Sequence, residues 1–227
     1  MKSKFAAVCS AAALGIAAAS APAFAGTMSW NFLTLAGNPA QPGASLMGTS
    51  YTFTQGSMSL TANSMTQSGS SWAMGTEDLY AKNGGSVDES GLGLMGDPSG
   101  DHEIFYPNGI ELTGFSGHVS SVMIGSLQGT ATNGESWAVF GSNDGSTWTQ
   151  LGSGMGGGAE DFTASSLLSY SDLIIAEPSA TPYINSNDIV LMGVTTTVPE
   201  PGTLALFGAG LLGCALLIAR RRRVRQD

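Results

Sequence analysis

The central part of this chain lacks cysteine. Only Cys9 and Cys214 are present, and each lies in an apolar stretch near one end of the sequence. Residues 26–198 therefore hold no disulfide and no thiolate metal site. A fold built from this region has to rely on its hydrophobic core, and about 170 residues are enough to form one substantial core.

Basic side chains are almost missing from the same region. Lys82 is the one basic residue of 26–198, against fifteen acids, which gives a formal net charge of −14. A surface of this kind repels phosphate backbones, so nucleic acid is not expected as a partner. Divalent cations and neutral or cationic polymers are compatible with it.

Helical periodicity is also lacking between residues 26 and 198. Short segments instead alternate apolar and polar residues, as in Met28, Trp30 and Phe32 against Ser29 and Asn31. Many short strands separated by Gly, Asn and Asp predict an all-β fold, a single antiparallel β-sandwich or jelly roll over residues 26–194. The predicted strands lie at 28–32, 51–53, 58–60, 119–127, 136–141, 173–175 and 188–194.

Two local patterns refine this prediction. Asn143-Asp144-Gly145 is turn chemistry between apolar segments and predicts a β-hairpin. The glycines of 91–96 match G-x-G-x-x-G, but a loop precedes them and Asp97-Pro98 follows, so no helix can open there. This segment is predicted to be a glycine-rich strand and not a nucleotide loop.

The first 25 residues have the features of a secretory signal peptide. Lys2 and Lys4 precede an apolar, alanine-rich stretch, and Ala23-Phe24-Ala25 provides a small-residue cleavage site before Gly26. Residues 1–25 are therefore left out of the fold prediction.

The last thirty residues predict a membrane segment. Residues 203–219 carry no charge and as a helix would measure roughly 25 Å, near the short limit for a bilayer span. The basic tail 220–227 should stay on the cytoplasmic side, which orients the helix; its arginines are Arg220, Arg221, Arg222, Arg223 and Arg225. Residues 195–202 are predicted to be a stalk between the domain and the membrane.

The order of these C-terminal parts resembles the PEP-CTERM sorting signal of Gram-negative bacteria. Its motif residues would be Val198, Pro199, Glu200 and Pro201, followed by the apolar helix and the arginines. The resemblance implies processing by an exosortase-type enzyme, an inner-membrane intermediate, and delivery to the cell surface or an exopolysaccharide matrix. Residues 79–85, 91–94, 102–104 and 110–112 also resemble ectodomains that often precede this tail, and 140–145 is similar to a hairpin of discoidin-like sandwiches. These likenesses imply a β-sandwich and no particular activity.

An acidic segment from Asp88 to Glu111 is the densest candidate for a binding site. Calcium accepts irregular sets of oxygen ligands from loops, and Asp97, Asp101 and Glu103 are the predicted ligands. A solvated acidic loop is the competing interpretation. The aromatic residue predicted to be free to contact a glycan is Trp148, directly after the hairpin turn.

No catalytic residues are predicted, because neither histidine has a metal-spaced partner and no serine stands in G-x-S-x-G. The expected function is that of a non-enzymatic exported protein. One alternative is a carbohydrate-binding sandwich with a structural calcium. The other is a secreted hydrolase, which would need two carboxylates facing each other across a cleft.

Overall fold

The computed structural model describes residues 24–32, 34, 45–84, 86–115, 117–130, 133–178 and 188–199. Residues 27–197 form one compact unit. In the described part of the chain, no helix is long and apolar enough to cross a membrane. The predicted membrane helix 203–219 and all but the end of the predicted signal peptide lie outside the described residues.

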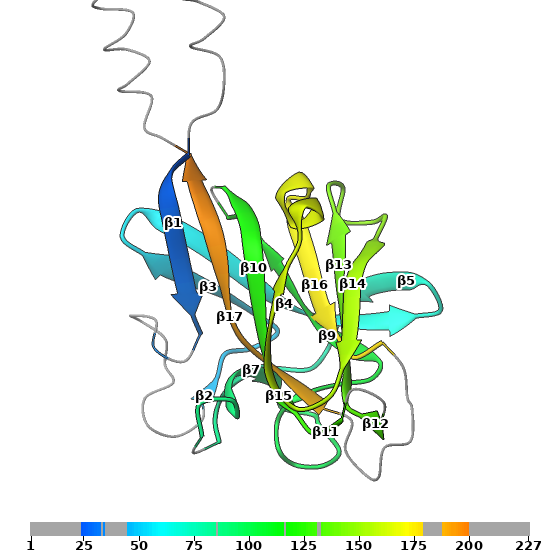
Figure 1. Cartoon of the computed structure of the whole chain (residues 1–227). Coiled ribbons are helices and arrows are strands. Elements are labelled where there is room, and N and C mark those ends of the chain that lie inside the picture. Colours follow the sequence, from blue (N-terminus) through cyan, green and yellow to red (C-terminus); the bar gives the residue numbers. More distant parts are fainter. Residues whose placement is uncertain are drawn as a thin grey trace, which may run out of the picture. The chain divides into compact units, whose positions relative to one another are not determined.

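The unit of residues 27–197 is built on two large antiparallel sheets (Figure 1). The first has eight strands, in the order β15-β10-β17-β7-β6-β2, with β1 and β8 also paired to β17. Its strands are β1 (Phe24–Asn31), β2 (Ser45–Leu46), β6 (Leu79–Asn83), β7 (Ser90–Leu94), β8 (Ile104–Phe105), β10 (His118–Leu127), β15 (Gly158–Thr163) and β17 (Asp188–Pro199).

The second sheet has seven strands, in the order β14-β13-β16-β9-β4-β3, with β5 paired to β4. Its strands are β3 (Ser50–Gln55), β4 (Met58–Ser68), β5 (Ser71–Met74), β9 (Asn108–Thr113), β13 (Ser136–Ser142), β14 (Thr149–Met155) and β16 (Asp172–Ala176). A two-stranded ribbon, β11 (Gly129–Thr130) with β12 (Asn133–Gly134), and one 3₁₀ turn, η1 (Ser165–Ser169), complete the described elements. The predicted all-β antiparallel sandwich is confirmed.

Alternation along the strands produces the core between the sheets. In and just after β1, Trp30 and Phe32 are fully buried while Ser29 and Asn31 are exposed. Side chains of both sheets meet in one apolar cluster that includes Phe53, Leu92 and Leu112. Burying each side chain of this size contributes about 1.5–3 kcal/mol to folding.

The predicted hairpin is present as β13 and β14, paired antiparallel from Ser136↔Met155 to Gly141↔Thr149. In its turn, Asp144 Oδ1 accepts hydrogen bonds from the N–H groups of Ser146 and Thr147, at 2.9 and 2.7 Å. Gly145 has φ +66°, a conformation that favours glycine.

The first four residues of the G-x-G-x-x-G segment lie in a strand, β7, as predicted, whereas Gly96 lies in the turn after it. The two glycines within the strand have a packing role. A Cβ at Gly93 would lie 1.9 Å from the carbonyl oxygen of His102, and one at Gly91 would lie 2.4 Å from that of Leu191. Neighbouring backbones therefore approach β7 too closely for any side chain at these two positions.

β17 differs from the prediction at its C-terminal end. The domain was expected to end at residue 194, but Thr195, Thr196 and Thr197 pair with Ser121, Val119 and His118 of β10, and the strand continues to Pro199. The polar sequence resembles a stalk, yet threonine is β-branched and suits a sheet. Residues 195–197 thus pair within the sheet, in the part of the chain that was predicted to begin the stalk.

Candidate functional site

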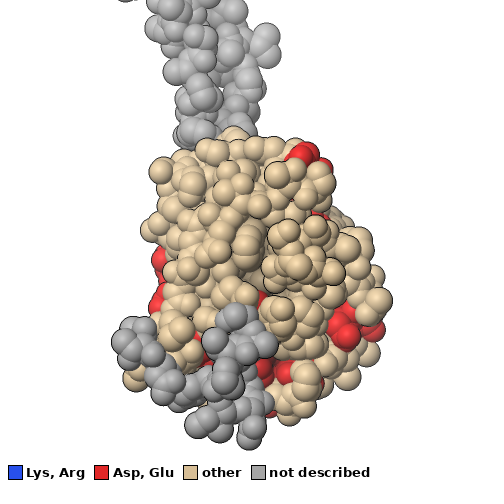
Figure 2. All heavy atoms as spheres, turned by 90° about the vertical axis from the view of Figure 1, so that its right-hand side faces the viewer, with Lys and Arg blue, Asp and Glu red and all other residues tan. Residues whose placement is uncertain are grey.

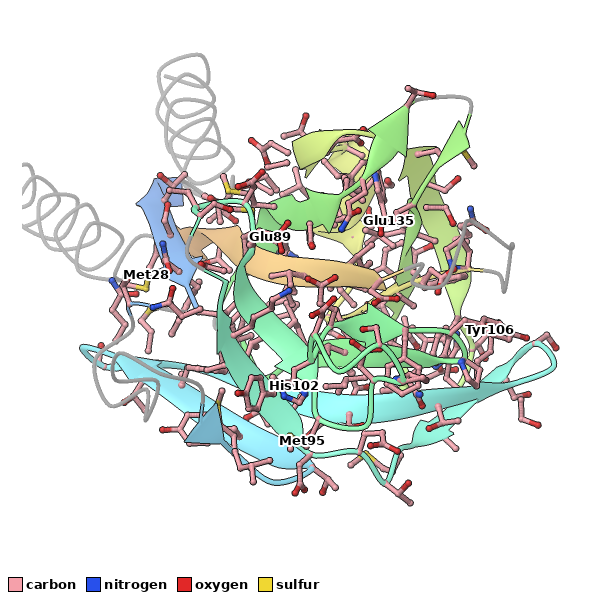
Figure 3. All side chains as sticks on the ribbon, turned by 90° about the horizontal axis from the view of Figure 1, so that it is seen from below. Met28, Glu89, Met95, His102, Tyr106 and Glu135 are labelled. Atoms are coloured by element: carbon pink, nitrogen blue, oxygen red, sulfur yellow. The ribbon has the colours of Figure 1, made fainter. Side chains whose placement is uncertain are left out.

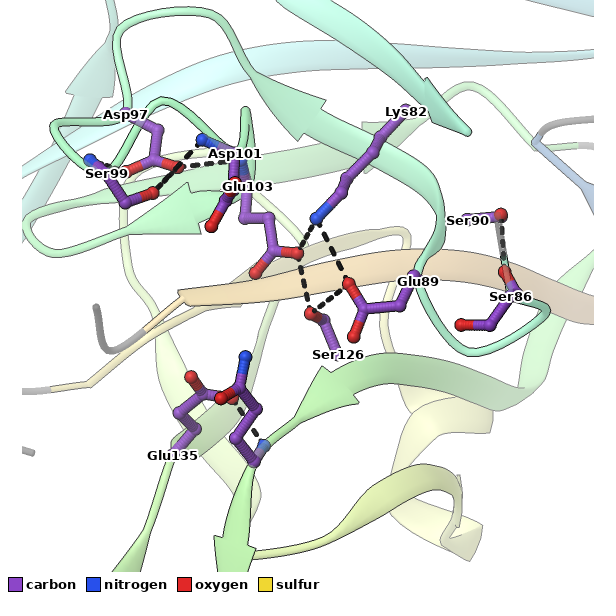
Figure 4. Close-up of polar contacts among 11 residues, drawn as sticks. Lys82, Ser86, Glu89, Ser90, Asp97, Ser99, Asp101, Glu103, Ser126 and Glu135 are labelled. Atoms are coloured by element: carbon purple, nitrogen blue, oxygen red, sulfur yellow. Dashed lines mark hydrogen bonds and ion pairs between the residues drawn. The ribbon is translucent and has the colours of Figure 1, made fainter. Parts of the chain in front are cut away.

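A part-buried polar group that contains the two ion pairs of the described residues surrounds Lys82 of β6 (Figure 4). Its ammonium donates to Glu89 Oε2 at 3.2 Å and to Glu103 Oε1 in a shorter contact. The Ser126 hydroxyl lies within hydrogen-bond distance of the same carboxylates, 2.6 Å from Glu103 Oε1 and 3.1 Å from Glu89 Oε2. We call these four residues the Lys82 network. It links the β6–β7 turn, the segment before β8 and the end of β10.

Backbone strain is concentrated at this network. Among the described non-glycine residues, His102 and Ser126 are the two with positive φ, 62° and 60°. His102 directly precedes Glu103, and the Ser126 N–H donates to the carbonyl of Asp88 at 2.7 Å. A non-glycine residue in this region costs about 1–3 kcal/mol and persists where its surroundings over-determine it. Here the hydrogen bonds of Ser126 hold the backbone in place.

More carboxylates are buried near the network than it can pair. Glu135, before β13, is 1% exposed and accepts a 2.5 Å hydrogen bond from the Gln128 N–H. Asp188, at the start of β17, is 4% exposed, and its Oδ2 is buried without a hydrogen-bond partner in the described part of the chain. In the view from below, Glu89 and Glu135 project among the strands, while Met95 and Tyr106 lie at the rim (Figure 3).

Burial sets the protonation behaviour of these acids. It raises the pKa of Glu103 to about 7, against the opposing effect of Lys82, and the pKa of Glu135 to about 8. Burial and the charge of Asp97 raise the pKa of Asp188 to about 6. Burial alone would lower the pKa of Lys82, but its hydrogen bonds and the charges of Glu103 and Glu89 outweigh that effect, and the pKa is raised. Near neutral pH the cluster therefore carries protons on some of its carboxylates.

The predicted calcium ligands have other partners. Asp97 accepts hydrogen bonds from the Ser99 N–H at 2.9 Å and the Ser99 hydroxyl at 2.5 Å, and Glu103 faces Lys82. Asp101 is exposed. In the described ranges, no group of three or more His, Cys, Asp or Glu side chains is arranged to hold a metal ion. Calcium binding by Asp97, Asp101 and Glu103 stays a prediction.

Trp148, the predicted glycan contact, is only half-buried and packs against a small second core cluster that contains Met65, Trp72 and Ile174. Its indole Nε1 is buried and has no hydrogen-bond partner within the described structure. This aromatic side chain thus covers the outer side of the second sheet, and it offers less stacking surface than the sequence suggested.

Sequence reasoning missed the Lys82 network, Glu135 and Asp188. One feature of the sequence could have indicated the network. Lys82 is isolated among the fifteen acids of residues 26–198, and a single cation in such a region is expected to pair with one of them. On the face shown in Figure 2, Asp and Glu gather in patches and the described residues show no Lys or Arg. Nothing in the sequence marked the first residue of β17 as a neighbour of the acidic loop.

The described region also contains an open groove of about 500 Å³ on the first sheet. It is bordered by β1, β10, β17 and the β6–β7 segment. The lining residues are Ser29, Trp30, Asn31, Thr34, Asn83, Ser86, Val87, Ser90, Ser121, Met123, Met192, Gly193, Val194 and Thr195.

Comparison with known protein families finds a match at the C-terminal end of the chain. The PEP-CTERM protein-sorting motif matches residues 197–223. The chain carries this sorting motif. Of its residues, Val198 and Pro199 lie at the end of β17, whereas Glu200, Pro201 and the five arginines Arg220, Arg221, Arg222, Arg223 and Arg225 lie outside the described residues. The motif implies export, a membrane-anchored intermediate and an exosortase-type processing enzyme. No curated protein and no solved structure matches the chain significantly.

Proposed function

We propose that this chain is a non-enzymatic exported protein, which its PEP-CTERM tail delivers to the cell surface or to an exopolysaccharide matrix. The sorting motif at residues 197–223 is the observation that carries the proposal. The β-sandwich that precedes it, residues 27–197, is the part delivered.

The polar chemistry of the sandwich supports a structural and not a catalytic role. Glu103, Glu135 and Asp188 are at most 4% exposed, so a substrate in solvent does not reach them. A glycoside hydrolase needs two carboxylates on either side of an accessible glycosidic bond. The described groove, which is open, has no carboxylate in its lining.

Sorting is tested by replacing Pro199, Glu200 and Pro201 with alanine and following the protein in cell fractions. We expect the variant to accumulate in the inner membrane with its tail uncleaved, because the processing enzyme reads an extended, proline-flanked site. Intact-mass analysis of each fraction reports removal of the signal peptide and of the tail.

A matched control removes two other prolines, Pro39 and Pro42, and should be exported like the unaltered chain. Normal export and normal mass of the triple-alanine variant would contradict the proposal and leave residues 203–219 as a plain anchor.

A further inference from the structure

Lys82 lies against two carboxylates at once, in a region that contains no other lysine and no cysteine. Its ammonium contacts Glu89 Oε2 at 3.2 Å and Glu103 Oε1 in the shorter of the two contacts (Figure 4). The side chains of Glu103 and Lys82 are 4% and 12% exposed, whereas that of Glu89 is 31% exposed. An amine and a carboxyl group thus meet where there is little water, while the second carboxylate reaches solvent.

The Lys82 network has the groups that amide formation needs. Although burial opposes it, the hydrogen bond and the charge of Glu103 raise the pKa of Lys82, so the amine needs a base to become a nucleophile. Glu89 is within reach of that proton. Burial raises the pKa of Glu103 to about 7, so part of this electrophile is protonated at neutral pH. The Ser126 hydroxyl, 2.6 Å from Glu103 Oε1, can donate to the oxygen on which negative charge develops.

Two residues with positive φ hold these groups in place. His102, directly before Glu103, has φ 62°, and Ser126 has φ 60°. The Ser126 N–H donates at 2.7 Å to the carbonyl of Asp88, the residue before Glu89. Such backbone conformations persist where the surroundings enforce them, and they are common at reactive sites. The fixed backbone lowers the entropic cost of keeping the reacting atoms together.

We propose that Lys82 and Glu103 form an intramolecular amide bond after the domain has folded. The ammonium gives one proton to Glu89, and its nitrogen bonds to Cδ of the protonated Glu103. A second proton of that nitrogen passes to the departing Oε2 hydroxyl, which leaves as water. Atoms and charges balance without an oxidant or a cofactor. The ion-paired network described above is the state before this step, in which both side chains still ionise.

The bond would link β6 to the segment before β8 in a region that has no disulfide. It closes a loop of about 20 residues, and a cross-link of this kind stabilises a domain mainly by restricting its unfolded chain. The inference concerns the sandwich alone and goes beyond the proposed function, because neither export nor removal of the tail is needed for the bond to form.

Trypsin tests the bond directly, because Lys82 is the one tryptic site of residues 26–198. The full chain is purified in detergent, denatured and digested, and the products are examined by gel electrophoresis and mass spectrometry. We expect the peptide bond between Lys82 and Asn83 to stay uncut, since trypsin does not recognise an acylated lysine. The uncut fragment should be about 18 Da, one water, lighter than its sequence. Fragment spectra should locate the link at Glu103.

The matched control is Lys82→Arg, which keeps the positive charge and the tryptic site but has a guanidinium group that stays protonated. It should be cut after position 82 and should have its full mass. Glu89→Gln lacks the base and should form the linked chain at least about 10-fold more slowly in samples taken during expression. Asp161→Asn changes an exposed acid of β15 and should be linked like the unaltered chain.

Complete cleavage of the unaltered chain after Lys82, together with its full mass, would overturn the proposal and leave an ordinary ion pair. A link from Lys82 to another carboxyl group would overturn it as well, and so would a folded Glu89→Gln chain that becomes linked at the normal rate. Circular dichroism verifies folding of each variant. If Glu89→Gln does not fold, the digest and the mass of the unaltered chain decide.

Discussion

Asp144 in the β13–β14 turn and Glu103 in the Lys82 network both accept a hydrogen bond from a serine hydroxyl, at 3.0 and 2.6 Å. Their pKa values nevertheless move in opposite directions. The backbone N–H groups of Thr147 and Ser146 hold the pKa of the exposed Asp144 far below its usual range, whereas burial raises the pKa of Glu103 to about 7 in spite of a lysine partner. At Glu103, the loss of solvent thus affects the pKa more than hydrogen bonding and ion pairing do. At the exposed Asp144, the hydrogen-bond donors lower the pKa without an opposing effect of burial of that size.

The largest effect on stability is expected when Lys82 is replaced. Lys82→Met leaves Glu89 and Glu103 without their cation, and breaking a buried pair in this way costs about 3–5 kcal/mol. We expect this loss of unfolding free energy at pH 8, and a smaller loss at pH 5, where Glu103 is protonated. Urea denaturation of residues 26–199 at both pH values measures it.

Adding Glu103→Gln to Lys82→Met should recover part of the stability at pH 8, because a neutral amide needs no counter-ion. Equal stability of the single variant and the unaltered domain at pH 8 would show that the network contributes nothing.

The next effect is the dependence of stability on pH. Glu103 and Glu135 have ordinary pKa values of 4.5 and Asp188 of 3.8, against about 7, 8 and 6 in the folded domain. The native state therefore binds more protons than the unfolded state between these values, and the unfolding free energy decreases as the pH rises from 5 to 8. We expect a decrease of at least ~1 kcal/mol.

Glu135→Gln cannot ionise at this position, so its unfolding free energy should depend less steeply on pH. Near pH 5, its unfolding free energy should be close to that of the unaltered domain. A domain equally stable at pH 5 and pH 8 would contradict the burial of these acids.

The smallest effect is expected at the turn. Asp144→Ala removes the acceptor of the Ser146 and Thr147 N–H groups and of the Ser142 hydroxyl, but these groups can bond to water. Because the pKa of Asp144 is lowered, its contribution is present at neutral pH and is lost only in strong acid. Thermal unfolding at pH 7 should show a lower melting temperature than the unaltered domain, and the change should be smaller than that of Lys82→Met.

Asp144→Asn retains one side-chain oxygen acceptor and serves as the control, with an intermediate melting temperature. If Asp144→Ala destabilised the domain as much as Lys82→Met, the contrast between the two regions would be wrong.

The sequence predicted those features that depend on neighbouring residues. Alternation placed Trp30 and Phe32 in the core, and Asn143-Asp144-Gly145 gave the hairpin, because strand faces and turn conformations are set within a few residues. The Lys82 network was not predictable in this way. Lys82, Glu103 and Ser126 come together only after β6, β8 and β10 are placed, and an acidic loop looks alike in sequence whether it holds calcium or pairs with a distant lysine.

β17 is an interior strand of its sheet, with β10 on one side and β1 and β7 on the other, and its last residues lead directly into the sorting motif. Tension transmitted along this strand from the tail acts parallel to the strand and across its hydrogen bonds. Both flanking ladders then share the load in shear, whereas an edge strand pulled in the same direction would be held by one ladder. The strand that leads into the sorting motif is therefore held more firmly against such a pull than an edge strand would be.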